Sequence, residues 1–316
     1  MKHIQRKLGF LLLLIISYSF VQAQAPLQKV VVDKTAYSFY IVSDAGRNGY
    51  YKQKIVAETL GKLAETIHPK FILANGDTFH YNGVRSTSDP LWMTNFESIY
   101  SHPELLVDWY PVYGNHEYRG NTQALIDYTQ ISRRWNMPAH YYTVVKKIDK
   151  ENSLRIVCID TPPFLKEYQN ALDQFPDIAK QDTRKQLVWI DSVLTVSKEK
   201  WVVVMGHHPI YSEDAHHGST QELIAQLDPI LRKHHVDFYF AGHIHSAQHI
   251  QKEGMDYIVS ASASLGAPAT YGPDTKYENY AEGFTICSVK SGTFEVIFVN
   301  EKGEELYRYK KQKITK

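Results

Sequence analysis

The most constraining feature of the sequence is a series of short apolar segments, most of which end abruptly in polar residues. Each segment is four to seven residues long and rich in β-branched or aromatic residues, which is typical of buried strands. The stretches between them carry helical patterns, so the sequence predicts an α/β fold. The predicted strands are Tyr37–Ser43, Phe71–Ala74, Trp109–Tyr113, Arg155–Ile159, Trp201–Met205 and Phe238–Ala241.

Helix and hairpin signals fill the intervals between these strands. Apolar residues from Val56 to Ile67 recur every three or four positions and share one helical face. Ser219 and Glu222 form a capping-box pattern, which predicts a helix that continues to Leu231. Glycine-containing turns at residues 291–292 and 301–303 predict C-terminal hairpins. Hairpins add antiparallel strands, so the sheets are expected to be mixed.

Composition favours an ordinary globular protein. The 316 residues include 35 Lys and Arg against 34 Asp and Glu, which gives a net charge of +1. This balance offers no bulk attraction for nucleic acid or anionic lipid, so neither is an expected partner. No low-complexity linker or internal repeat divides residues 24–316, which are predicted to form a single domain. The sequence makes no prediction of oligomeric state.

The N-terminus has the pattern of a secretory signal peptide. Lys2, Arg6 and Lys7 precede the apolar run Leu8–Val21, and Ala23 completes a small-residue cleavage site. A membrane anchor is the alternative, but the run is shorter than the roughly 20 residues that a spanning helix needs. We therefore expect residues 1–23 to be removed, and a secreted or periplasmic protein that no longer contacts the membrane.

The two cysteines lie within predicted buried strands. Cys158 and Cys287 are flanked by apolar residues, so we expect buried free thiols. An oxidising compartment permits a disulfide between them, which is the alternative.

Five of the predicted strands end in residues that bind metals. The carboxyl ends of strands in an open α/β sheet form its ligand crevice, so these clusters are expected to converge. Imidazole mixed with carboxylate and amide oxygen suits Fe, Mn or Zn better than Ca or Mg alone. Seven ligands exceed the needs of one tetrahedral ion and suit two ions that share a carboxylate. The candidate ligands are Asp44, Asp77, His80, Asn115, His207, His243 and His245.

In this order, the clusters resemble the motifs of the calcineurin-like metallophosphoesterases: Asp-x-(His or Gly), Gly-Asp, Gly-Asn-His-(Asp or Glu), Gly-His and Gly-His-x-His. The sequence is most similar to the small tartrate-resistant type of purple acid phosphatase, through Asp44-Ala45-Gly46, the turn His217–Thr220 and the stretch Ile131–Pro138. The resemblance implies a four-layer α/β/β/α sandwich of two mixed sheets flanked by helices.

One position departs from the purple acid phosphatase pattern. There the second motif reads Gly-Asp-x-x-Tyr, and the tyrosine phenolate binds ferric iron and gives the colour. Here His80 occupies that position and Tyr81 follows. We expect His80 to be the ligand, with a weaker preference for Fe(III) and no purple band. A one-residue shift that makes Tyr81 the ligand is the alternative, but it turns the side chain to the opposite face of an extended segment.

The resemblance also implies a function and roles for individual residues. Asp44, Asp77, His80 and His245 hold one metal, while Asp77, Asn115, His207 and His243 hold the other. A metal-bound hydroxide attacks the phosphorus of a small phosphomonoester. His116 and His217 are the catalytic candidates near the leaving group, and Glu117 is expected to orient the His116 imidazole. His208 is expected in the pocket wall. His216 is also expected at the pocket, and it is the alternative to its neighbour His217 in the catalytic role.

Two other functions are compatible with the same residues. A phosphodiesterase or nucleotidase of the same superfamily uses the same metal ligands. A non-catalytic metal-binding relative is the third reading, although none of the seven ligand positions carries an inert residue.

Overall fold

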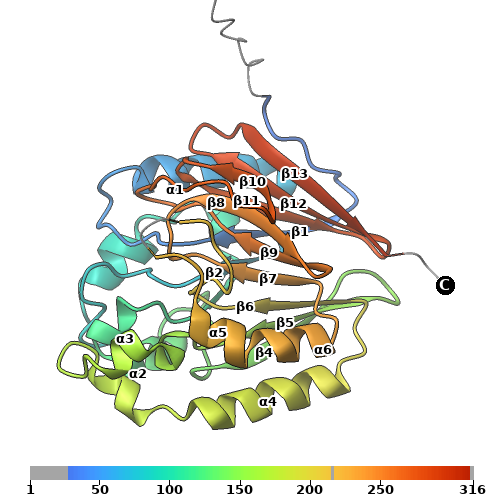
Figure 1. Ribbon diagram of the computed structural model, residues 1–316. Coiled ribbons are helices and arrows are strands. Elements are labelled where there is room, and N and C mark those ends of the chain that lie inside the picture. The colour runs from blue at the N-terminus through green and yellow to red at the C-terminus, as the bar shows by residue number, and fades with distance from the viewer. Residues whose placement is uncertain (1–27, 215–216, 314–316) are drawn as a thin grey trace, which may run out of the picture.

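The computed structural model describes residues 28–214 and 217–313, within which the chain forms two β-sheets packed face to face (Figure 1). The first sheet has the strand order β13-β12-β11-β1-β2-β3, and the second has the order β10-β8-β9-β7-β6-β5-β4. The predicted signal peptide, residues 1–23, lies outside the described residues. No helix among the described residues is both long and apolar enough to cross a membrane.

The first sheet consists of β1 (Tyr37–Val42), β2 (Phe71–Ala74), β3 (Asp108–Pro111), β11 (Gly283–Val289), β12 (Thr293–Asn300) and β13 (Glu305–Gln312). The second consists of β4 (Tyr142–Lys147), β5 (Ser153–Cys158), β6 (Trp201–Met205), β7 (Phe238–Ala241), β8 (Ala247–Lys252), β9 (Met255–Val259) and β10 (Thr275–Asn279). The α-helices are α1 (Gln53–Ile67), α2 (Thr122–Asp127), α3 (Lys166–Gln169), α4 (Thr183–Val196), α5 (Gln221–Gln226) and α6 (Asp228–Lys233). Shorter helical turns are η1 (Trp92–Glu97), η2 (Pro103–Leu105), η3 (Glu117–Arg119), η4 (Tyr128–Gln130), η5 (Pro162–Phe164) and η6 (Pro176–Lys180).

Both sheets are mixed, as predicted. Parallel pairing joins β1, β2 and β3 in one sheet, and β5, β6, β7 and β9 in the other. The predicted C-terminal hairpins connect β11 to β12 and β12 to β13 as antiparallel pairs. Within each sheet, the parallel strands bring their carboxyl ends to the same edge. The predicted ligands lie at this edge of both sheets.

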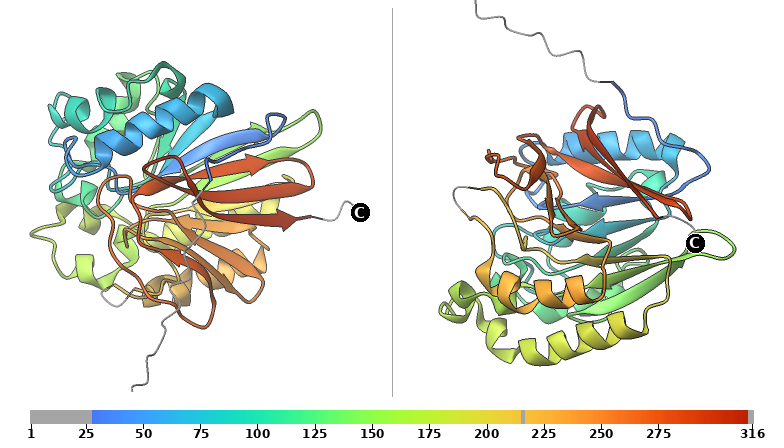
Figure 2. Two further views of the ribbon diagram at one scale, coloured as in Figure 1. Left: turned by 90° about the horizontal axis from the view of Figure 1, so that it is seen from above. Right: turned by 45° about the vertical axis from the view of Figure 1, so that its right-hand side comes forward.

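Helices cover the outer faces of the two sheets (Figure 2). Helix α1 lies over the first sheet, and α4, α5 and α6 lie over the second (Figure 1). Of the four apolar residues predicted to share one face of α1, Val56 and Leu60 are buried, while Leu63 and Ile67 are partly buried against the core. The predicted α/β/β/α architecture is therefore confirmed.

Aromatic side chains fill the space between the sheets. The Phe294 ring of β12 lies 4.7 Å from the Phe238 ring and 5.4 Å from the Trp201 ring, both in the other sheet. Its own sheet contributes Phe39, whose ring is 6.1 Å from that of Phe294. These apolar contacts hold the two ligand-bearing edges together. Cys158 and Cys287 are buried and free, as expected.

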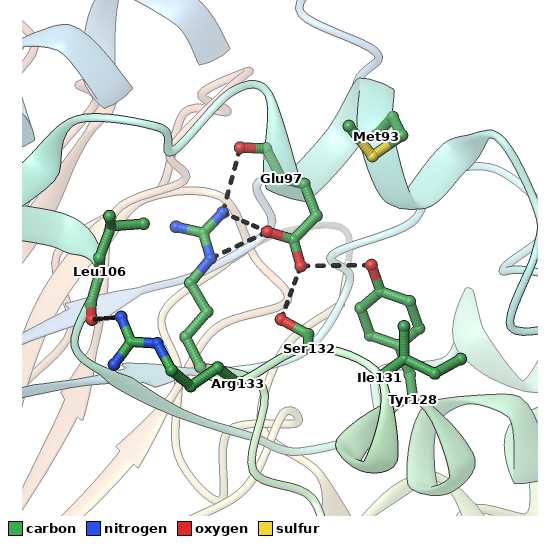
Figure 3. Close-up of a pocket in the computed structure, with 8 residues that line it drawn as sticks. Met93, Glu97, Leu106, Tyr128, Ile131, Ser132 and Arg133 are labelled. Carbon is green, nitrogen blue, oxygen red and sulfur yellow. Dashed lines mark hydrogen bonds and ion pairs between the residues drawn. The ribbon is translucent and has the colours of Figure 1, made fainter.

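The stretch Ile131–Pro138 is held by a partly buried ion pair (Figure 3). The Arg134 guanidinium donates to Glu97 Oε2 from Nε at 3.1 Å and from Nη2 at 2.9 Å. The other Glu97 oxygen accepts from the Ser132 hydroxyl at 2.7 Å and the Tyr128 hydroxyl at 3.2 Å. This arrangement fixes the segment against η1, on the same side of the molecule as β3.

The predicted helix from Ser219 to Leu231 is wrong in two respects. The chain forms two short helices, because Pro229 in the first turn of α6 lacks the N–H that would continue α5. The capping box is absent, since Thr220 is the N-cap residue and makes no side-chain cap. The Ser219 hydroxyl instead donates to the carbonyl of Ser212.

Candidate metal centre

The predicted ligands gather where five strands end. Asp44 follows β1, Asp77 and His80 follow β2, and Asn115 follows β3; His207 follows β6, and His243 and His245 follow β7. Five of the seven line a cavity of about 290 Å³, and Asp44 and His207 lie buried directly beneath it. The cavity ligands are Asp77, His80, Asn115, His243 and His245.

Asp77 lies at the centre of the cluster. Its Oδ2 atom is 3.3 Å from His80 Nε2 and 3.4 Å from His207 Nε2. These imidazoles belong to the two different predicted ligand sets. The carboxylate therefore has the position required of a ligand shared by two ions.

Asp44 belongs to the first predicted ligand set, together with His245. Its Oδ1 atom lies 3.4 Å from His245 Nε2. Its carboxylate also accepts the backbone N–H of His243 at 3.0 Å and the hydroxyl of Ser43. These donors fix a fully buried carboxylate in one orientation.

His207 contacts the other members of the second predicted ligand set. Its Nε2 atom lies 3.2 Å from Asn115 Oδ1 and 3.2 Å from His243 Nδ1. The opposite ring nitrogen, Nδ1, donates to the carbonyl of Asn75 at 2.8 Å. That hydrogen bond leaves Nε2 free to bind a metal, the usual arrangement for a ligating histidine.

Several ligands are held in backbone conformations that side chains seldom adopt. Asp44, Asp77, His243 and His245 have φ angles of 51°, 52°, 73° and 57°, in the left-handed region. Such strain persists where surrounding structure fixes it, and it clusters at functional sites. Gly114 permits the Asp77 side chain to approach its backbone closely, because a Cβ at position 114 would lie 2.1 Å from Asp77 Oδ1.

The donor set fits metal ions. Both ring nitrogens of His80 are buried without a hydrogen-bond partner in the described chain, although buried polar atoms are normally satisfied. Asp44, His80 and His245 bring one ligand atom each within 4.8 Å of one another, and so do Asp44, Asp77 and His207. Imidazole and carboxylate together suit Zn, Mn or Fe.

The ionisable side chains of the centre strongly shift one another's pKa values. Burial alone lowers the pKa of His207, but the Asp77 and Asp44 carboxylates raise it to about 9. Burial raises the pKa of Asp77, yet the surrounding imidazoles of His207, His116 and His80 hold it well below its usual value. The Asp77 carboxylate is therefore ionised, and His207 carries a proton at neutral pH that a binding metal ion would displace.

His116 and His217 lie beside the ligands, on opposite sides. The His116 ring is 4.1 Å from the His80 ring, and its Nδ1 donates to the carbonyl of Tyr81 at 2.7 Å. Burial lowers the pKa of His116 to about 4. The His217 ring is 4.6 Å from the His243 ring, and His217 Nδ1 lies 2.8 Å from Asp214 Oδ2.

The geometry favours His80 over Tyr81 as the ligand. The His80 ring is buried beside Asp77, whereas the Tyr81 ring is more than half exposed and packs against the Arg47 guanidinium.

The expected contact of Glu117 with the His116 imidazole is wrong. The short helix η3 turns Glu117 inward, where its carboxylate accepts backbone N–H groups of Asp77, Phe79 and Gly114 at 2.9, 3.1 and 2.6 Å. Burial and the charge of Asp77 raise the pKa of Glu117 to about 7. Glu117 therefore braces the Asp77 loop rather than the histidine.

His208 is a fully buried residue outside the wall of the metal cavity. Its ring nitrogens lie 3.0 Å from the hydroxyls of Thr161 and Tyr168. It lines a neighbouring cavity, together with His217 and His243. His216 lies outside the described residues.

Sequence reasoning missed two arginines at the cavity. Arg47 and Arg119 both line it, and each lies within three residues of a predicted site residue. That proximity to Asp44 and His116 is the signal that could have found them. Their guanidinium groups give the cavity positive charge, which suits a phosphorylated substrate.

The family model described as calcineurin-like phosphoesterase matches residues 37–247. Tartrate-resistant acid phosphatase type 5 of Oryctolagus cuniculus is 32% identical over 271 residues, covering 80% of this chain and 82% of the relative. Purple acid phosphatase 17 of Arabidopsis thaliana is 32% identical over 288 residues, covering 86% and 83%.

Solved structures share the fold. "GAP50 the anchor in the inner membrane complex of Plasmodium" has a TM-score of 0.78 at 23% identity, covering 88% of this chain and 89% of that one. Purple acid phosphatase PPD1 from yellow lupin has a TM-score of 0.62 at 12% identity, covering 87% of this chain and 53% of that one.

The chain belongs to the calcineurin-like phosphoesterase family. Within the family it is of the tartrate-resistant and purple acid phosphatase type, as its motifs led us to expect, and it is a phosphoric ester hydrolase. The family and the His/Asp clusters together imply metal ions and a small phosphorylated substrate.

Proposed function

We propose that the chain is a secreted, dinuclear-metal phosphatase that hydrolyses phosphomonoesters. The observation that carries the proposal is the position of Asp77 Oδ2, 3.3 Å from His80 Nε2 on one side and 3.4 Å from His207 Nε2 on the other. One ion would be held by Asp44, Asp77, His80 and His245, and the other by Asp77, Asn115, His207 and His243.

When bound, the ions supply Lewis acidity toward the phosphoryl oxygens and make water reactive near neutral pH. In the reaction, a water oxygen bonds to phosphorus, the ester P–O bond breaks and a proton passes to the departing alcohol. The chain's own contribution is to fix the reacting groups. Glu117 holds the backbone of Asp77, and Arg47 and Arg119 attract the phosphate dianion.

His116 is proposed to face the leaving-group oxygen. Its Nδ1 proton is engaged by the Tyr81 carbonyl, so Nε2 is the atom available to the substrate. Because its pKa is lowered to about 4, His116 would carry the Nε2 proton at acidic pH and would donate it to the ester oxygen there, either as general acid or as a charged hydrogen-bond donor. His217, oriented by Asp214, is proposed to assist from the opposite wall.

Secretion rests on the signal-peptide pattern of residues 1–23. Its test is the N-terminal sequence of protein recovered outside the cytoplasm, which should start at Gln24. Recovery of the uncleaved chain in the membrane fraction would contradict it.

The activity is tested with the chain from Gln24 onward, supplemented with Fe, Mn or Zn. Phenyl phosphate should be hydrolysed much faster than diphenyl phosphate. Asp77→Ala should abolish turnover and lower the bound metal, whereas Asp149→Ala, at an exposed hairpin, should change neither. Faster turnover of the diester would make the chain a phosphodiesterase.

A third outcome would change the class of function. Metal binding without turnover of either ester would favour a non-catalytic role, and one solved structure of this fold is titled an anchor.

A further inference from the structure

A second cavity adjoins the metal cavity and shares two residues with it. It has a volume of about 480 Å³, and Arg47 and His80 line both cavities. Its remaining walls are mostly aromatic. Tyr50, Tyr51 and Tyr81 line it and are 73%, 57% and 56% exposed, so their rings are free to contact a ligand.

Arg47 lies at the boundary between the two cavities. It is 9% exposed, and its Nε atom is buried with no hydrogen-bond partner in the described chain. Its guanidinium carbon lies 4.9 Å from the centre of the Tyr81 ring and 5.9 Å from that of Tyr51. A guanidinium whose Nε is unsatisfied, placed beside the candidate metal centre, suits an anionic oxygen of the substrate.

The loop that carries Arg47, Tyr50 and Tyr51 is held in place by hydrogen bonds from its backbone to neighbouring side chains. Gln53 Oε1 accepts the backbone N–H of Arg47 at 3.1 Å and of Gly49 at 2.7 Å. Asn95 Oδ1 accepts the N–H of Asn48 at 2.7 Å. Tyr51 is held at a φ of 53°, a conformation that tyrosine seldom adopts. A braced loop with strained residues is typical of a binding site formed before its ligand arrives.

The geometry also relates this cavity to the leaving group. The Tyr81 ring lies 6.1 Å from the His116 ring, and the Tyr81 carbonyl orients that imidazole. A substrate whose ester oxygen faces His116 therefore places the attached group beside Tyr81. The cavity on the opposite side carries the carboxylates of Glu167 and Glu222 instead of exposed tyrosines.

We propose that the cavity of Arg47, Tyr50, Tyr51 and Tyr81 is a leaving-group subsite, which selects phosphomonoesters of aromatic or benzylic alcohols. The substrate ring stacks on Tyr51 and Tyr81, while Arg47 contacts the phosphoryl group. The inference rests on the proposed phosphomonoesterase function and adds the substrate class. Loss of one aromatic contact should lower the preference for aromatic over aliphatic esters about threefold to tenfold.

The test compares benzyl phosphate with ethyl phosphate, because their alcohols differ little as leaving groups. The ratio of their kcat/KM values should favour benzyl phosphate in the wild type. It should fall about fivefold in Tyr51→Ala and in Tyr81→Ala, and further in the double variant. Tyr81→Phe should retain the ratio, since stacking needs only the ring. The control is Tyr271→Ala, an exposed tyrosine that lines neither cavity.

Binding provides a second measurement that does not depend on turnover. Benzylphosphonate should bind the metal-loaded wild type more tightly than ethylphosphonate by calorimetry, and the tyrosine variants should lose that difference. Equal losses for both ligands, or no loss, would overturn the subsite while leaving the phosphatase function intact. If the wild type hydrolyses neither of these esters nor phenyl phosphate, the proposed function itself fails, and the subsite fails with it; if it hydrolyses phenyl phosphate but not benzyl phosphate, only the subsite fails.

Discussion

The carboxylate of Glu117 accepts the backbone N–H of Asp77 at 2.9 Å, and this contact supports the central ligand from behind. Glu117 is fully buried, and Gly114 and Phe79 donate to the same carboxylate. One side chain thus joins the loops after β2 and β3, which carry ligands for both proposed ions. A hydrogen bond to the backbone of a ligand controls where that ligand can lie.

Glu117→Gln is expected to weaken metal binding about tenfold to a hundredfold. The amide has one acceptor oxygen, so its NH₂ group must face at least one backbone N–H that the carboxylate satisfied. Metal affinity by calorimetry measures the effect. Glu151→Gln, at an exposed turn, is the matched control. Unchanged affinity in Glu117→Gln would show that the brace is dispensable.

The iron-loaded wild-type protein is expected to lack the purple charge-transfer band. His80 occupies the position of the tyrosine ligand, and its Nε2 lies 3.3 Å from Asp77 Oδ2. His80→Tyr should therefore introduce a visible band on iron loading, whereas His68→Tyr, at an exposed site, should not. Absorption spectra of the three proteins check this. A wild-type band that Tyr81→Phe abolishes would identify Tyr81 as the ligand.

Asp256→Asn is expected to destabilise the fold in a pH-dependent manner. Burial raises the pKa of Asp256, but His249 and Lys311, each 2.9 Å from its carboxylate, lower it overall. At pH 7 the change should cost about 2–3 kcal/mol, because a buried charge loses its partner.

A lowered native pKa means that this stabilisation is present above the unfolded value near 3.9 and disappears as the pH falls through the native value. The difference between wild type and Asp256→Asn should therefore shrink below about pH 4. Urea unfolding of metal-free protein at several pH values measures it. Asp274→Asn removes an ion pair with Lys252, whose two side chains are 36% exposed, and should cost less than about 1 kcal/mol throughout. A difference that stays constant with pH would contradict the assignment.

The sequence predicted the position of the centre because strand ends are easily recognised. Strands β2, β6 and β7 have the bounds that their apolar runs indicated, and each is followed by glycine next to or near a ligand. The packing of the two sheets against each other then brings residues far apart in the sequence, such as Asp77 after β2 and His207 after β6, within 3.4 Å.

Interactions that depend on the path of a loop could not be predicted. Glu117 adjoins His116 in sequence, but one turn of helix directs its side chain to the backbone of another loop. Arg47 joins two cavities only because Gln53 and Asn95 fix the loop that carries it and Asn48. Neither contact produces a regular spacing of residues that could be recognised in the sequence.

Removal of metal is expected to lower the thermal stability of the whole domain. The proposed ligands come from the ends of strands in both sheets, so bound ions would connect the two sheets at one edge. An ion present at 100 times its dissociation constant stabilises the fold by about 2.7 kcal/mol. For a domain of this size the melting temperature should fall by roughly 5–10 °C with a chelator and recover with Zn or Mn. Calcium should restore little, because it prefers oxygen ligands and this centre is rich in imidazole. Asp77→Ala should show a smaller response to the chelator and to Zn than the wild type, since it loses the shared ligand. Equal recovery with calcium, or an undiminished response in Asp77→Ala, would mean that the ions bind elsewhere.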